Sequence, residues 1–173
     1  REDNIKSFLL DCLKDIQIQI ESDSIGNLFI TKGQADIYPC IAAHLDEIHT
    51  LCKREIVIDN DTIYAVDEMW NRVANACNLS FFDDVKYILE CDRKGAHDVV
   101  AIGKGDIQLC ESNFIPQDIL DKYDYQMVSG GKTDVVALKM RGLKIPVCNI
   151  SCGYYNAHKN NEYTHFSELQ NCL

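Results

Sequence analysis

Basic residues are scarce in this sequence, and their scarcity excludes one class of partner. The 173 residues include 17 Lys and Arg against 27 Asp and Glu, which gives a net charge of −10. The acidic residues are spread along the chain rather than clustered, and such a chain is repelled by polyanions. We therefore expect neither a nucleic acid nor an anionic membrane as its main partner.

Cys-x-x-Cys pairs and long apolar runs are also absent from the sequence. The nine cysteines are unevenly spaced and no two enclose two residues, so a structural zinc ribbon is not indicated. An odd, irregular set resembles reduced thiols better than a disulfide framework. No apolar run has the length of a membrane span, and no charged start precedes an apolar signal core. We expect a soluble, cytoplasmic protein.

The hydrophobic content, 46% of the residues, is sufficient for one domain over residues 1–173. Residues 17–31 and 55–66 have the pattern of two hairpins, and residues 151–164 that of a polar, aromatic loop. The periodicity predicts an α/β fold. The expected helices span residues 5–16, 116–123, 133–141 and 166–173, and the expected strands outside the hairpins span 39–44, 85–91, 99–102, 107–110 and 145–149.

The strand expected at residues 39–44 ends in His44, and Asp46 follows two positions later. Its small and apolar residues predict a central strand covered on both faces. Side chains at i and i+2 of an extended chain point the same way, so His44 could bind a metal while Asp46 orients it. A loop histidine with no role in binding is the alternative, and for an isolated His-x-Asp it is the commoner case.

Two further predicted ligands lie where other apolar segments stop. Asp92 follows the strand at residues 85–91, and His158 lies in the loop after the last core strand. Imidazole and carboxylate ligands from separate strand ends are typical of a catalytic zinc, manganese or cobalt site. Taken alone, such a set can also arise by chance in an acidic chain.

Five motifs together resemble the co-catalytic di-zinc exopeptidases, and the small, lid-less relatives of tripeptidase T and of the glutamyl and leucyl aminopeptidases most of all. The motifs run through nearly the whole chain in the family's order. The resemblance implies a single domain with a mixed central sheet flanked by helices, of the phosphorylase/hydrolase-like type. The motifs are NLFITKG at 27–33, HLD at 44–46, CDRKG at 91–95, TDVVAL at 133–138 and GYYNAHKNNEY at 153–163.

The resemblance also implies roles for individual residues. His44 matches the first zinc ligand and Asp46 the residue that orients it. Asp92 resembles the carboxylate that completes the first metal's shell, and His158 the histidine of the second metal. In this family two metals share a bridging aspartate, activate a water and polarise the scissile carbonyl.

The substrate side of the site is expected to be formed by two loops. Thr133 and Asp134 resemble the family's substrate-side loop, and Asn156 lies in the loop that carries His158. We therefore predict that these three residues bind substrate.

Two parts of the family's pattern have no counterpart here. No Asp-Asp-Lys-type segment for the bridging aspartate occurs between Thr50 and Asp92, and the Glu-Glu pair is missing. One alignment sets residues 67–69 against that pair and keeps Glu68 as the general base; the other, which we prefer, loses both glutamates. The domain is thus expected to lack a core segment between about 66 and 78 and to be truncated in its last helix. A true deletion, an engineered one and an incomplete sequence are the alternatives.

These alternatives lead to two functional hypotheses. With a complete site, the protein is a metal-dependent hydrolase of peptide or other small amide bonds; with a true deletion, it is an inactive relative that binds a small molecule or protein partner in the same cleft. A small peptide or amide-containing molecule is the expected partner. The lid-less cleft also leaves its mouth open to contacts between copies, as in a homo-oligomer.

Overall fold

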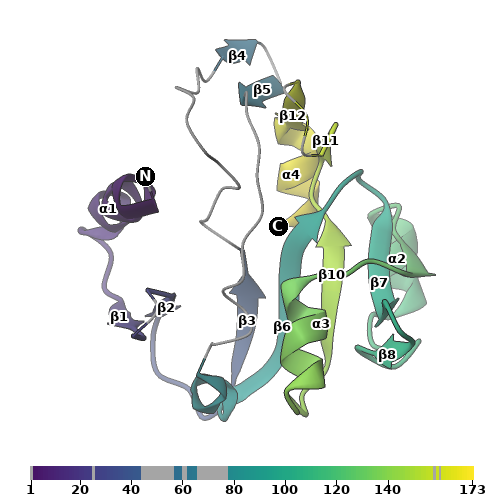
Figure 1. The fold of residues 1–173 in the computed structure, drawn as a ribbon, viewed down its shortest axis with the longest axis horizontal. Helices are drawn as coiled ribbons and strands as arrows, with labels where there is room; N and C mark the ends of the chain where they lie inside the picture. Colours follow the sequence, from purple (N-terminus) through teal and green to yellow (C-terminus); the bar gives the residue numbers. More distant parts are fainter. Residues whose placement is uncertain are drawn as a thin grey trace.

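A six-stranded mixed sheet forms the centre of the structure, a computed structural model that describes residues 2–24, 26–43, 57–59, 62–65, 78–157, 159 and 161–173 (Figure 1). The strand order is β3-β6-β10-β7-β8, and β9 also pairs with β7. Strands β3, β6 and β10 are parallel, whereas β7 is antiparallel to β10 and β8 and parallel to β9. The strands are β3 (Tyr38–Ala42), β6 (Val85–Arg93), β7 (Asp98–Gly103), β8 (Ile107–Gln108), β9 (Gln126–Ser129) and β10 (Val147–Ser151).

Two smaller sheets complete the β structure. The hairpin expected at residues 17–31 is confirmed as β1 (Gln19–Ser22) and β2 (Leu28–Thr31). The second hairpin, β4 (Val57–Asp59) and β5 (Thr62–Ala65), is confirmed too, and it joins a four-stranded sheet of order β11-β12-β5-β4. Strands β11 (Tyr154–Tyr155) and β12 (Glu162–His165) lie where a loop was expected, so that expectation is wrong. Their pairing stacks Tyr155 on Tyr163, with ring centroids 5.3 Å apart.

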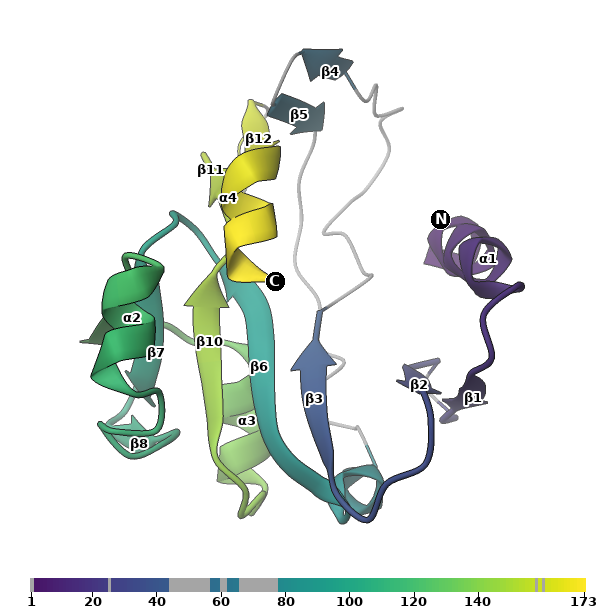
Figure 2. The same ribbon diagram turned by 180° about the vertical axis from the view of Figure 1, so that it is seen from behind.

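The four expected helices are all present, with shifted ends. Helices α2 and α4 cover one face of the central sheet and α3 covers the other (Figure 2). A short 3₁₀ helix (Leu79–Phe82) precedes β6. None of the helices in the described part of the chain is long and apolar enough to cross a lipid bilayer. The helices are α1 (Glu2–Leu13), α2 (Gln117–Lys122), α3 (Asp134–Met140) and α4 (Phe166–Cys172).

The two faces of the sheet contribute to two separate hydrophobic cores, because successive side chains of a strand point to opposite faces. On the α3 face, Ile88 and Val147 pack with Val135 of the helix. On the other face, Val99 and Cys148 pack with residues of α2 and α4, including Leu120. Strand β10 is buried over its whole length. Its neighbours β6 and β7 flank it, and a hydrophobic core covers each face of the sheet.

Strand β3 corrects one expectation. It was predicted to be central and covered on both faces, but it is an edge strand of the described sheet. Cys40 and Ala42 pack against the α3-side core, whereas Ile41 is 63% exposed. Pro39 is compatible with this position, because an edge strand has backbone groups that need no partner in the sheet.

Candidate functional site

The carboxyl ends of the parallel strands β3, β6 and β10 meet at one edge of the central sheet, as Figure 1 shows. Ligands bind at this edge in open α/β sheets. Asp92 lies there, one residue before the end of β6, and its main-chain N–H donates to Oδ1 of Asn149 at 3.3 Å. Glu90 lies on the face that α3 covers, and Asp92 is close enough for its charge to act on Glu90, although a β-bulge between Glu90 and Arg93 interrupts the pairing of β6 with β10. The strand therefore presents two carboxyl groups to one region.

Glu90 is the most unusual of these groups. Its side chain is only 3% exposed, and Oε1 accepts a hydrogen bond from the main-chain N–H of Val135 at 3.3 Å. Burial, with the negative charges of Asp92 and Asp134 as further causes, raises the pKa of Glu90 to about 8. The Glu90 carboxyl group is accordingly protonated at neutral pH.

The first turn of α3 is capped by the side chain of Glu90 and not by that of its N-cap residue. Thr133 occupies the N-cap position, but its side chain makes no capping hydrogen bond. The Thr133 hydroxyl acts to lower the pKa of Glu90, so the two groups are neighbours, yet they do not form a hydrogen bond of good geometry. A strand residue thus satisfies one of the free N–H groups of the helix.

Three buried polar atoms in this region have no hydrogen-bond partner within the described part of the chain. They are Oε2 of Glu90, Oγ1 of Thr133 and Nδ2 of Asn149. Glu90 and Asn149 are paired in register across β6 and β10, and Asn149 is 1% exposed. Native proteins rarely leave such atoms unsatisfied, and an ordered water or a ligand is a usual partner.

The turn after Asp92 is fixed by an ion pair and a buried hydroxyl. Arg93 Nε and Nη2 both bind Oδ2 of Asp98, at 2.8 and 2.6 Å. Ser151, which is fully buried, donates from Oγ to the carbonyl of Lys94 and accepts from the N–H of Asp98. These contacts hold β6 against β7 and β10 at the end where Asp92 lies.

Strand β11 lies against the same turn. Gly95 donates its N–H to the carbonyl of Tyr154 at 2.9 Å, and the Tyr154 hydroxyl donates to the carbonyl of Asp92 at 3.5 Å. Burial, with the charge of Asp92 next, raises the pKa of Tyr154. Asn156 follows with a φ of 55°, and its Nδ2 donates to the carbonyl of Asn161. Asn156 therefore shapes the β11–β12 turn, and its predicted substrate contact stays a prediction.

The structure brings together three of the residues that the sequence singled out. Asp92, Thr133 and Asp134 all lie around Glu90, close enough to change its pKa. His44, Asp46, Glu68 and His158 fall outside the described residues, and so does the segment between about 66 and 78. No set of three His, Cys, Asp or Glu side chains within the described ranges forms a metal-binding group. Asp92 is thus the one expected ligand whose surroundings can be described.

Glu90 and Asn149 are the residues that the sequence analysis missed. Each lies in a strand that was correctly expected, and each was treated as part of an apolar run. A signal was present, because a carboxylate or amide inside a buried strand needs a partner. Glu90 is flanked by Leu89 and Cys91, which point to the opposite core.

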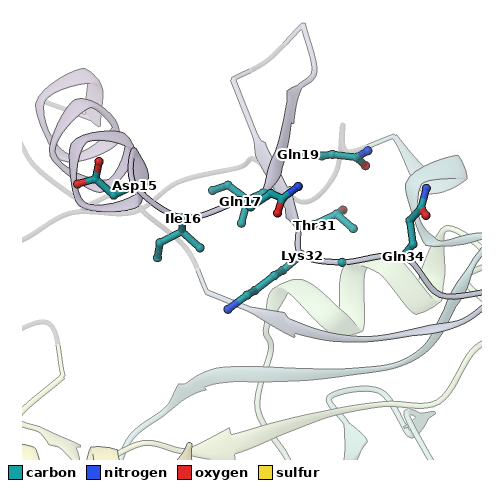
Figure 3. A pocket seen from close by; sticks show the side chains of 9 residues that line it. Asp15, Ile16, Gln17, Gln19, Thr31, Lys32 and Gln34 are labelled. Carbon is teal, nitrogen blue, oxygen red and sulfur yellow. The ribbon is translucent and has the colours of Figure 1, made fainter.

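A separate hollow lies before the amino end of β3, away from the Asp92 edge (Figure 3). It is formed by Asp15 to Gln19, which lead from α1 into the start of β1, and by Thr31 to Gln34, which include the end of β2 and the residues after it. Lys32 and Asp15 are the charged residues that line it. None of the residues predicted for the site contributes to this hollow.

Comparison with known proteins finds the same fold in three solved structures. The dodecameric structure of PhTET1 aligns over 98% of this chain and 90% of its own, with 12% identity and a TM-score of 0.67. Aminopeptidase PepT from Bacillus cereus aligns over 99% and 90%, with 11% identity and a TM-score of 0.71. The TET1 peptidase of Pyrococcus horikoshii aligns over 98% and 91%, with 13% identity and a TM-score of 0.62. The chain has the fold of these peptidases.

The peptidase fold confirms the expected mixed sheet flanked by helices and the family resemblance at the level of the fold. At identities of 11 to 13%, the likeness extends to the fold and not to individual side chains. Neither a protein-family profile nor a curated protein sequence matches the chain. The roles of the residues around Asp92 must therefore be inferred from the chemistry of their side chains and not from the comparisons.

Proposed function

We propose that the protein is a metal-dependent hydrolase of peptide or other small amide bonds, of the exopeptidase type. The observation that carries this proposal is the position of Asp92 at the carboxyl edge of the parallel strands, in a chain that has the fold of the TET1 and PepT peptidases. Strand β3 is parallel to β6 and ends at the same edge, two residues before His44. We therefore propose that the His44 imidazole and the Asp92 carboxylate act together at neighbouring strand ends.

Zinc fits the chemistry of this set of donors. Asp92 offers a carboxylate whose main chain is held by Asn149, and orphaned polar atoms lie beside it. His44 and His158 are the imidazole ligands we propose with it, with Asp46 orienting His44 and manganese or cobalt as substitutes for zinc. Such a metal polarises a carbonyl and lowers the pKa of a bound water.

The chain's own residues would act on the substrate from the side of α3. Thr133 and Asp134 begin that helix next to Glu90, and Asp134 can hold the free amino group of a peptide by charge. Asn156 is the proposed contact from the β11–β12 turn, and Glu68 the proposed base. This arrangement predicts that the substrate needs a free N-terminus.

The test is Asp92→Asn, which keeps the side-chain shape and removes the charge. We expect the wild-type chain to bind zinc and to hydrolyse peptides with a free N-terminus in preference to N-acetylated ones. Both properties should be lost on chelation, and kcat/KM should fall about 100-fold or more in Asp92→Asn. Asp106→Asn makes the same change in an exposed turn and should leave both unchanged.

The second candidate, an inactive relative that binds a peptide or protein partner, is favoured by the sequence between residues 66 and 78. That segment offers Asp67 and Glu68 as its only carboxylates, and neither falls in an Asp-Asp-Lys-type or Glu-Glu motif. Peptide binding without turnover, by a chain that has been loaded with zinc, would establish this candidate and reject the hydrolase.

We also propose that the protein forms a homo-oligomer. PhTET1 is a dodecamer, and the TET1 peptidase of Pyrococcus horikoshii assembles into a tetrahedron or an octahedral shell. Sedimentation velocity at micromolar concentration should give a species several times heavier than the 19.7 kDa chain. A monomer across the whole concentration range would contradict this prediction.

A further inference from the structure

Two thiols lie against each other on the face of the sheet opposite Glu90. Cys91 Sγ of β6 and Cys172 Sγ of α4 are 3.6 Å apart, although 81 positions separate them in sequence. A disulfide bond is about 2.05 Å long. The two sulfurs therefore need to approach by only about 1.5 Å to form a covalent link between the strand and the helix.

Few buried contacts of the helix oppose this movement. Helix α4 has no buried residue, and Asn171, beside Cys172, donates a hydrogen bond of 3.2 Å to the carbonyl of Tyr123. Cys91, in contrast, is held in the middle of the sheet by its pairing with neighbouring strands.

Both thiols are also partly accessible, unlike most others on this face. Cys91 and Cys172 are half-buried, whereas Cys110, Cys148 and Cys152 are buried. A small oxidant can reach a half-buried sulfur, while a buried thiol in an apolar core is inert.

We propose that Cys91 and Cys172 form a redox-active dithiol, which a hydroperoxide converts to a disulfide that ties α4 to β6. One thiolate attacks a peroxide oxygen and the O–O bond breaks, which gives a sulfenic acid and, from hydrogen peroxide, hydroxide. The second thiolate attacks the sulfenic sulfur, the S–S bond forms, and a second hydroxide leaves. The two protons that the thiols released convert the two hydroxides to water, so two thiols are oxidised and one peroxide is reduced.

The link would join two segments that flank the candidate site. Cys91 directly precedes Asp92, and α4 directly follows β12, which pairs with β11 beside the turn after Asp92. If the proposed function holds, the disulfide fixes the C-terminal hairpin relative to the strand that bears Asp92. Formation of the bond itself does not depend on that function.

The experiment uses the full chain, reduced with dithiothreitol, desalted, and exposed to one equivalent of hydrogen peroxide. Remaining thiols are alkylated with N-ethylmaleimide, and the peptides are mapped by mass spectrometry. We expect a peptide pair linked through Cys91 and Cys172, a loss of 2 Da in the intact mass, and full reversal by dithiothreitol. Cys12→Ser, which removes an exposed thiol on α1, should form the same link to the same extent.

Two variants and one wild-type readout decide the outcome. Cys91→Ser and Cys172→Ser should each abolish the link and leave the other sulfur reactive with N-ethylmaleimide or overoxidised. Recovery of Cys91 and Cys172 as separate alkylated peptides from oxidised wild-type protein, or links between other cysteines only, would overturn the proposal. The wild-type map settles the matter even if a variant does not fold, and it needs no measurement of hydrolysis.

Discussion

Replacing Glu90 by Gln tests the electrostatics of the candidate site directly. The glutamine keeps a carbonyl oxygen for the N–H of Val135, which lies 3.3 Å from Glu90 Oε1. It also directs an amide group toward the region of Thr133 Oγ1, an acceptor that has no hydrogen bond within the described part of the chain. The substitution thus preserves shape and hydrogen bonding and removes only the ability to ionise.

The expected effect on stability follows from the raised pKa of Glu90. An unfolded glutamate releases its proton near pH 4.5, whereas the folded chain retains it up to about pH 8. Between these values the native state binds one more proton than the unfolded state, so the free energy of unfolding falls as the pH rises. At about 1.4 kcal/mol per pH unit, the loss is about 3 kcal/mol at pH 7 and reaches at most about 5 kcal/mol above pH 8.

Urea unfolding of wild type and Glu90→Gln, followed by circular dichroism between pH 5 and 8.5, measures this difference. The buffers contain a chelator, so that no cation near Asp92 changes the titration. We expect similar stabilities at pH 5 and a variant more stable than wild type by several kcal/mol at pH 8.5. Glu111→Gln, the same change at an exposed position, should show no such trend. A stability difference between wild type and Glu90→Gln that does not vary with pH would refute the reasoning.

Two further predictions concern the turns that surround the site. Gly153→Ala should lower the free energy of unfolding by about 1 to 3 kcal/mol more than Gly105→Ala, because both glycines have a φ near +80° but a Cβ at Gly153 would lie 2.7 Å from Glu168 Cβ, whereas one at Gly105 meets open space. Chemical denaturation of the two variants gives the comparison, and equal costs would contradict the close packing of α4 on this turn. Asp98→Asn weakens the ion pair with Arg93 and should cost about 1 to 2 kcal/mol in low salt and less in 1 M salt, again by denaturation; a cost that does not respond to salt would show that the pair's charge is unimportant.

The elements of the fold were largely predictable from the sequence because their patterns are local. The hairpin at residues 17–31 and the helix after Thr133 need only periodicity and turn residues. The edge position of β3 was not predictable, since an apolar run of five residues does not show how many neighbours its strand has. The sequence of residues 151–164 predicts a loop rather than β11 and β12, because two- and four-residue strands separated by a polar turn leave little pattern.

The candidate site was predictable where chemistry coincides with a strand end. Asp92 fits that description, and the structure places Thr133 and Asp134 near it through their common neighbour, Glu90. The sequence does not predict that Glu90 and Asn149 belong to the site, because the partner of a single polar residue in a strand is known only once the pairing register is known. The register pairs these two residues across β6 and β10 and so reveals a shared polar region.

The alternation of β6 explains how this chain can carry two kinds of chemistry in one strand. Glu90 faces α3, while Leu89 and Cys91 face the core beneath α2 and α4. A polar site and a thiol pair are therefore separated by the thickness of one sheet, although their residues are adjacent in sequence. Because Cys91 and Asp92 share a peptide bond, a link from Cys91 to α4 restrains the backbone of Asp92 without entering the polar site. Oxidation of Cys91 and Cys172 would then affect the position of Asp92 through the backbone of β6, and no solvent path between the two faces of the sheet is needed.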